Sequence, residues 1–126
     1  MHIILTDIDN SREFFFRPRR PLHSTTTISE VYRVLKSNGI FLSHIFSTKH
    51  SAIEYGEPYG DGSYNSFEGG FFSGESFTFF FASEQDIIEL YESKFTMVSK
   101  IHNVMEEKIS KEDDYRAMWN LICQKP

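Results

Sequence analysis

Runs of adjacent phenylalanines constrain this fold more than any other feature of the chain. They occupy residues 14–16, 71–72 and 79–81 and belong to 13 phenylalanines among 126 residues, 16% of which are aromatic. Rings of this size are costly to leave in water, so they must fill a core, line a ligand pocket or cover a partner surface. The other fractions, 40% hydrophobic and 25% charged, are ordinary for a folded protein. We therefore expect a single domain over residues 1–126.

Charge and cysteine content exclude several classes of protein. A formal net charge of -5 argues against general binding to nucleic acids or anionic membranes, and the only local basic cluster is Arg17, Arg19 and Arg20. No apolar run approaches the roughly 20 residues that span a bilayer, and the N-terminus lacks signal-peptide features. The single cysteine, Cys123, cannot form an internal disulfide. We expect a cytoplasmic protein with no membrane segment.

The first half of the chain predicts a strand, a loop, a helix and a strand. Residues 3–8 form a short apolar strand, and two prolines make 17–21 a loop. Thr27 and Glu30 have the spacing of a capping box, and an apolar stripe at helical spacing follows over residues 28–35. Gly39 can adopt the left-handed conformation that ends a helix. Residues 40–46 are apolar enough to be a strand buried on both faces.

A long segment rich in aromatic residues and glycine, 47–76, separates this strand from the second half. It is too long for an ordinary connection, and such loops tend to be functional. An aromatic strand over 77–81 follows, and then a helix that Ser83 caps together with Asp86. The remaining patterns predict strands at 95–104 and 117–124, with Trp119, Leu121 and Cys123 on one face of the last strand.

The helix-to-strand passage at residues 29–42, Ser-Glu-Val-Tyr-Arg-Val-Leu-Lys-Ser-Asn-Gly-Ile-Phe-Leu, resembles the class I S-adenosylmethionine-dependent methyltransferases. Segments 81–90, 91–98 and 119–126 are similar to later parts of that family, so the resemblance covers roughly residues 22–126. It implies an α/β fold: a partial Rossmann-like methyltransferase sheet of about four strands, the last of them antiparallel, with helices packed on the sheet. We also expect residues 3–8 to pair in parallel with 40–46, and the last strand to lie between 40–46 and 95–104.

The resemblance also implies a function, with one important departure. It implies methyl transfer from S-adenosylmethionine to a small-molecule acceptor. The family's glycine-rich cofactor turn is not found, however, because the only Gly-x-Gly spacing, Gly60-Asp61-Gly62, follows the strand that resembles the family's fifth. No cofactor-binding residue is therefore assigned. The sequence predicts a truncated or divergent methyltransferase-like domain, inactive alone.

Site candidates follow from the same resemblance. His23 lies where the family places a loop facing cofactor and substrate, and an imidazole can act as a base near neutral pH. Tyr55, Tyr59, Tyr64 and Phe71 lie in the 47–76 segment, where family members place substrate-covering residues. The alternatives are a loop histidine with local hydrogen bonds and rings that pack on the core.

The sequence also bears on metal binding and on partner binding. Four side chains could be drawn together as metal ligands, but their spacing fits no known site, and we predict no metal (His44, His50, Glu54, Asp61). A sheet of about four strands leaves one apolar edge bare, which predicts a homodimer or a separate partner chain. The alternative function is thus a non-catalytic interaction module that pairs through this exposed edge.

Overall fold

The computed structural model describes residues 3–5, 14–16, 25–60, 62–74, 77–107 and 114–126. Its strands are β1 (Ile3–Leu5), β2 (Phe14–Phe16), β3 (Ile40–Ser47), β4 (Glu57–Gly60), β5 (Ser63–Asn65), β6 (Phe79–Ala82), β7 (Thr96–Glu107) and β8 (Asp114–Gln124). Its helices are α1 (Thr25–Val34) and the short α2 (Glu84–Ile87), which continues into the π-helical turn η3 (Ile88–Glu92). Two 3-10 turns, η1 (Ser51–Tyr55) and η2 (Gly70–Phe72), complete the described elements.

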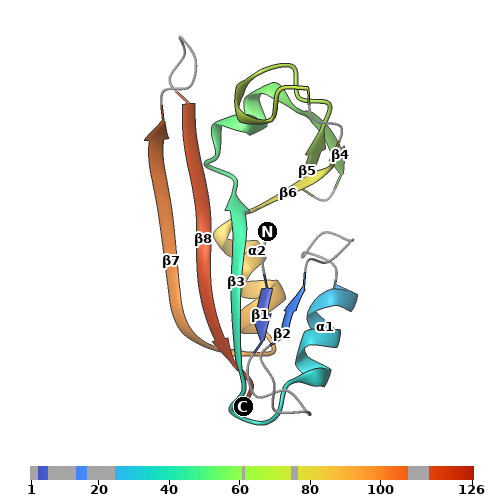
Figure 1. Ribbon diagram of the computed structural model, residues 1–126, viewed down its shortest axis with the longest axis vertical. Helices are drawn as coiled ribbons and strands as arrows, with labels where there is room; N and C mark the ends of the chain where they lie inside the picture. The colour runs from blue at the N-terminus through green and yellow to red at the C-terminus, as the bar shows by residue number, and fades with distance from the viewer. Residues whose placement is uncertain (1–2, 6–13, 17–24, 61, 75–76, 108–113) are drawn as a thin grey trace.

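The described strands form one mixed sheet around β3. On one side β3 pairs antiparallel with β8 from Ile40 to Phe46, and β8 pairs antiparallel with β7. On the other side β3 pairs antiparallel with β1 near its start and parallel with β6 at its end. The β7–β8 hairpin forms one side of the molecule, and the turns and short strands between β3 and β6 form a separate unit at the carboxyl end of β3 (Figure 1).

The expected Rossmann-like α/β fold is wrong. The structure is a mixed, mostly antiparallel sheet with two short helices, and among the described strands only β3 and β6 pair in parallel. The strand expected over residues 3–8 is described at Ile3–Leu5, and it pairs antiparallel with β3 rather than in parallel. A crossover helix joins parallel neighbours in a Rossmann-like sheet, whereas here α1 leads from the β1–β2 hairpin into β3. The antiparallel position of β8 between β3 and β7 does agree with the expectation for the last strand.

The main core lies on one face of the sheet. Alternate residues of β3 and β8 are buried there, beginning with Phe41 and Ile45 on β3. They pack against Ile28 and Val31 of α1 and the fully buried Tyr91 of η3. β3 was expected to be buried on both faces, but its other face is only partly covered, and His44 is exposed. On β8 the expected face is confirmed, because the buried side chains include Trp119, Leu121 and Cys123.

A second, smaller core lies in the unit at the end of β3. Strand β6 separates the two cores, because Phe80 and Ala82 point into the main core whereas Phe81 points into the small one. There Phe81 packs with Ala52 of η1 and the buried Phe67. The 47–76 segment therefore contains a hairpin, two helical turns and a core of its own, instead of an open loop.

Local capping follows the sequence in one helix and not in the other. Ser83 and Asp86 form the expected capping box of α2, with hydrogen bonds of 3.1 and 2.9 Å. The box expected at Thr27 and Glu30 is wrong, because α1 begins at Thr25 and the Glu30 carboxylate accepts hydrogen bonds from Arg33.

The end of α1 also differs from the expectation. Asn38, rather than Gly39, has the left-handed φ of 68°. Lys125 then completes this helix end, because its Nζ donates to the carbonyls of Tyr32 and Leu35 at 2.8 Å each. The C-terminal tail thereby caps the helix that precedes β3.

Candidate functional site

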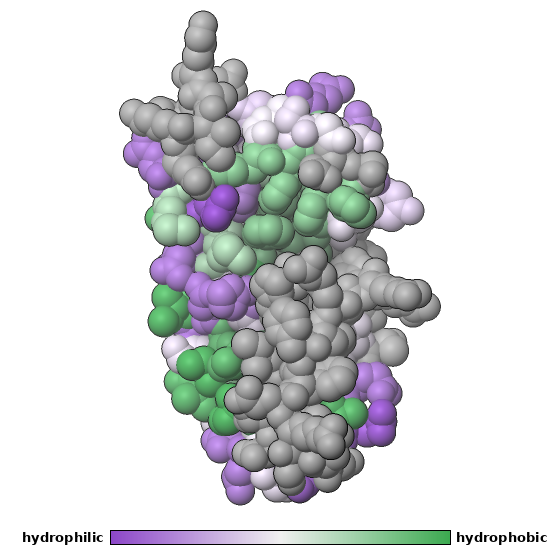
Figure 2. All heavy atoms as spheres, in the orientation of Figure 1, coloured by the Kyte–Doolittle hydropathy of each residue, from purple (hydrophilic) through white to green (hydrophobic). Residues whose placement is uncertain are grey.

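A pocket opens where the main sheet meets the small unit. Its volume is about 290 Å³, near the lower end of the range for small-molecule sites. Figure 2 shows hydrophobic surface gathered at this end of the molecule, above a band of polar residues on the same face. The lining residues come from β3, β8 and both helical turns of the small unit: His44, Phe46, His50, Phe71, Phe72, Arg116 and Met118.

The sheet supplies the floor of the pocket. His44 and Phe46 alternate with the buried residues of β3, so they point to the face opposite the main core. Met118 lies directly across from Phe46 in the β3–β8 register, and Arg116 is two residues earlier on the same face of β8. The floor therefore combines an apolar centre with a guanidinium and an imidazole at its margins.

The small unit supplies the wall. His50 begins η1, and its Nδ1 accepts a 3.1 Å hydrogen bond from the backbone N–H of Ala52. Phe71 and Phe72 come from η2, and the Phe72 ring stacks on the His50 ring at 5.4 Å between centroids. Phe46 and Phe71 approach the same imidazole edge-on at 5.3 and 5.2 Å.

This aromatic enclosure keeps His50 neutral. The residue is 2% exposed. Burial, helped by the positive charge of Arg116 and opposed by Asp114, lowers the pKa of His50 from 6.5 to about 4. Since Nδ1 accepts a hydrogen bond, the single ring proton of the neutral imidazole lies on Nε2. His50 is thus an uncharged N–H donor in an apolar wall, and at neutral pH it carries no positive charge.

Arg116 provides the positive charge of the site. Its guanidinium carbon lies 5.4 Å from the centre of the Phe71 ring, so it is held over the aromatic wall. The start of β8 is fixed to η1 by Ser51, whose Oγ accepts from the Tyr115 N–H at 3.0 Å and donates to Asp114 at 3.5 Å. Because Asp114 is buried, this contact ties the strand that carries Arg116 to the turn that begins with His50.

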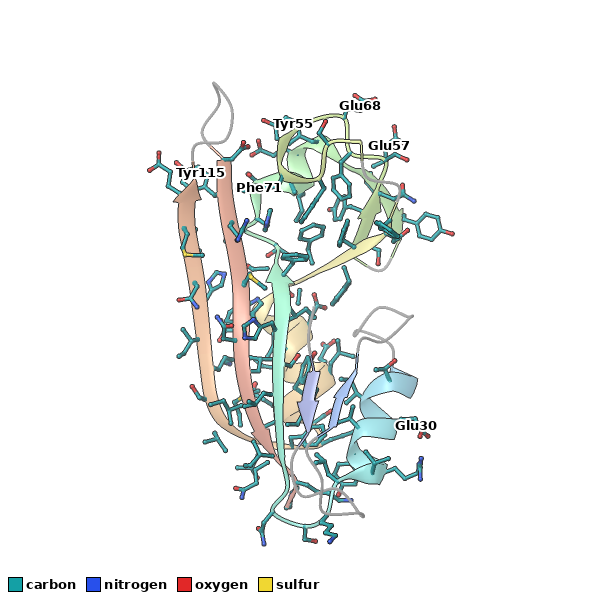
Figure 3. The ribbon with its side chains drawn as sticks, in the orientation of Figure 1. Glu30, Tyr55, Glu57, Glu68, Phe71 and Tyr115 are labelled. Carbon is teal, nitrogen blue, oxygen red and sulfur yellow. The ribbon has the colours of Figure 1, made fainter. Side chains whose placement is uncertain are left out.

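The structure distributes the residues expected at the site among different environments. Phe71 lines the pocket, and in Figure 3 it lies on the side of the small unit that faces β8. Tyr55 lies farther out in that view, and its ring packs against Gly69 and Gly70. Tyr64 packs in the small core against Phe81.

The other expected residues lie away from the pocket or outside the description. Tyr59 is 71% exposed on β4. His23 lies outside the described residues. Within the described part of the chain, no group of three or more acidic, histidine or cysteine side chains could hold a metal ion. Cys123 is buried in the main core, and burial raises its thiol pKa to about 12, which removes it as a nucleophile.

Phe71 is the one lining residue that was assigned to a small-molecule site from the sequence, and both polar donors discussed above, His50 and Arg116, were missed. His50 was considered only as a metal ligand, although its place just before a helical turn is typical of a capping residue. Arg116 lies just outside the predicted last strand, which was expected to begin at residue 117. If that strand is extended by one residue toward the N-terminus, its alternation puts Arg116 on the same face as Met118 and opposite to the buried face.

The comparisons with known proteins leave the family of this chain open. No protein-family model matches the sequence, and the search of curated proteins returns no match. No helix in the described part of the chain is long and apolar enough to cross a membrane.

Proposed function

We propose that this chain binds a small organic molecule in the pocket at the end of β3, and that it provides the methyl-acceptor side of an S-adenosylmethionine-dependent methyltransferase. The observation that carries the proposal is the pocket itself: an aromatic wall with a neutral imidazole and a guanidinium, built by the segment after β3. In the family that residues 29–42 resemble, the corresponding segment covers the substrate. Methyl transfer needs little beyond a dry site that positions the acceptor.

The acceptor, rather than the cofactor, suits this pocket. A volume of about 290 Å³ suits a molecule with a single ring and leaves no room for a nucleoside joined to an amino acid. Gly60 and Gly62, which form the only Gly-x-Gly spacing in the sequence, lie at the turn of the β4–β5 hairpin. Their φ angles of 100° and 79° are those of turn glycines. The cofactor would therefore be bound by other residues of this chain or of a second copy of it, both of which are present in a sample of the purified chain.

A pocket-filling variant tests this proposal. We expect ligand-observed NMR on a mixture of single-ring compounds to detect binders of the wild-type chain that Met118→Trp no longer binds. Met105→Trp is the matched control, because Met105 is 52% exposed on β7 and outside the pocket. Calorimetric titration with S-adenosylhomocysteine, with and without a bound compound, tests the methyltransferase part. If neither the chain nor its complex with an acceptor binds this product, the chain is not a methyltransferase subunit.

The edge strand β7 supports a second candidate function, an interaction module that pairs with another copy of the chain. Among the described strands β7 pairs only with β8, and it spans 12 residues at the outer side of the hairpin (Figure 1). Long free edges invite strand pairing. Its exposed side chains include four large apolar ones: Val98, Ile101, Val104 and Met105.

The side chains of β7 are complementary to those of a second β7 strand when the two strands pair antiparallel. If two β7 strands pair antiparallel around Asn103, Ile101 of each copy faces Met105 of the other, and Lys100 faces Glu106. We expect light scattering to show a dimer that Ile101→Lys converts to a monomer. Tyr59→Lys, a charge placed on an exposed aromatic of the small unit, should leave the dimer intact. A monomeric wild-type chain would remove this candidate.

A further inference from the structure

The pocket has one wall of rings and one margin of N–H donors, and this asymmetry defines the ligand. Phe46, Phe71 and Phe72 supply flat apolar surface, and Met118 completes it from the floor. No acidic side chain is among the lining residues. A ligand that fills this space therefore meets aromatic and thioether groups with its body and positive or neutral donors with its polar end.

The two donors line the same pocket and contact the same ring. The charge of Arg116 is felt at His50, since it is one of the causes of the lowered pKa of the imidazole. Both side chains contact Phe71, His50 with ring centroids 5.2 Å apart and Arg116 with its guanidinium at 5.4 Å. The Nε2–H of His50 has no hydrogen-bond partner among the described residues, and it lies in a side chain that is 2% exposed. A buried donor of this kind requires an acceptor, which a ligand can provide.

We propose that the pocket binds a monocyclic aromatic carboxylate, with its ring against Phe71 and Phe72 and its carboxylate between Arg116 and the Nε2–H of His50. This inference rests on the proposed function, because it names the chemical class of the small molecule. A carboxylate matches the planar guanidinium and accepts several hydrogen bonds at once. The ring satisfies the apolar wall by stacking, which an aliphatic acid of the same size would do less well.

Other ligand classes fit the lining residues less well. An organic cation would gain from the phenylalanine rings but would be repelled by the guanidinium held over Phe71. A phosphate carries more charge and is usually held by several backbone N–H groups, whereas the wall here consists of side-chain rings. A neutral ring compound would fill the pocket but would not make a charge-assisted hydrogen bond to Arg116.

The test compares isosteric probes on the intact chain. Calorimetry with benzoate, benzamide and cyclohexane carboxylate separates the contribution of the charge from that of the aromatic ring. We expect the aromatic carboxylate to bind at least about tenfold more tightly than the amide, which is the usual size of a charge-assisted hydrogen bond. Arg116→Met should remove this preference, while Arg116→Lys should keep part of it.

The matched control is Arg33→Met, which makes the same substitution on the exposed side of α1, away from the pocket. It should leave the affinities unchanged. Circular dichroism establishes that each variant is folded, and the preference of the wild-type chain for carboxylate over amide tests the proposal without any variant.

The outcomes distinguish this inference from the proposed function. Equal binding of acid and amide, blocked by Met118→Trp, would overturn the carboxylate and leave a small-molecule pocket. Selective binding of the acid without any binding of S-adenosylhomocysteine would support the carboxylate and contradict the methyltransferase. If no probe binds and no compound in the mixture binds either, both proposals are wrong.

Discussion

His50 illustrates how neighbouring side chains decide the charge of a single residue. Its exposed fraction is 2%, its Nδ1 accepts a backbone N–H, and phenylalanine rings surround it. Protonation would put a charge into that enclosure beside the guanidinium of Arg116, so the pKa falls to about 4. The sequence could suggest only that this histidine begins a turn, since the rings that desolvate it come from residues up to 31 positions away along the chain.

The lowered pKa predicts a loss of stability in mild acid. The unfolded chain binds a proton at His50 as the pH falls through about 6.5, whereas the folded chain does so only near 4. The unfolded state therefore binds more protons in that interval, and the free energy of unfolding decreases as the pH falls. At pH values below both pKa values, the free energy of unfolding is lower by about 3 kcal/mol than at neutral pH. Urea unfolding of the wild-type chain at a series of pH values measures it.

His50→Asn is the matched variant for this measurement. The asparagine oxygen can still accept the N–H of Ala52 at the start of η1, but the side chain no longer titrates. We expect the variant to be less stable at neutral pH, because it loses ring contacts, and to have a shallower slope between about pH 6.5 and pH 4. Parallel slopes in the two proteins would show that His50 is not the source of the acid sensitivity.

At the level of elements, local sequence predicted most of the helices and strands but few of their partners. The capping box of Ser83 and the alternation of residues 117–124 were predicted correctly, because both patterns are set by neighbours along the chain. The direction in which residues 3–8 pair with β3 was wrong, since pairing depends on contacts between distant segments. The start of α1 was wrong too, because Glu30 is held by Arg33 instead of capping the helix.

Ser83 provides a quantitative test at this scale. Ser83→Ala removes the hydroxyl that accepts the N–H of Asp86 at 3.1 Å, at the first turn of a short helix. We expect a loss of about 1 kcal/mol in the free energy of unfolding, measured by urea denaturation. Ser93→Ala is the control, because that exposed hydroxyl donates to a carbonyl at the other end of the same helical segment and caps no N–H group. A larger loss at Ser93 would contradict the capping argument.

At the scale of the whole molecule, the described residues form two cores that share one sheet. β6 contributes alternate residues to both, and β3 ends where they meet, so the pocket lies at the boundary between them. The sequence predicted that the phenylalanine runs must fill a core, line a pocket or cover a partner surface. It did not predict that the run at 79–81 would divide between two cores, because a strand with apolar residues on both faces does not reveal what lies on each.

This arrangement predicts that the small core can be loosened while the main core remains intact. Gly70 has a φ of 70°, and a Cβ there would lie 2.7 Å from the Tyr55 ring, whereas at Gly74, with a φ of 80°, it would meet no described atom within 4 Å. Alanine at either position bears the cost of left-handed backbone, about 1–2 kcal/mol, but only Gly70→Ala must also displace Tyr55.

Hydrogen exchange should therefore show faster exchange at the Glu68 and Phe81 amides in Gly70→Ala than in Gly74→Ala. The amides that join β3 to β8 should keep their protection in both variants, because the main core does not depend on that ring. Equal loss of protection across both cores would mean that the pocket lies within one cooperative unit, and that the small core cannot open by itself to admit a ligand.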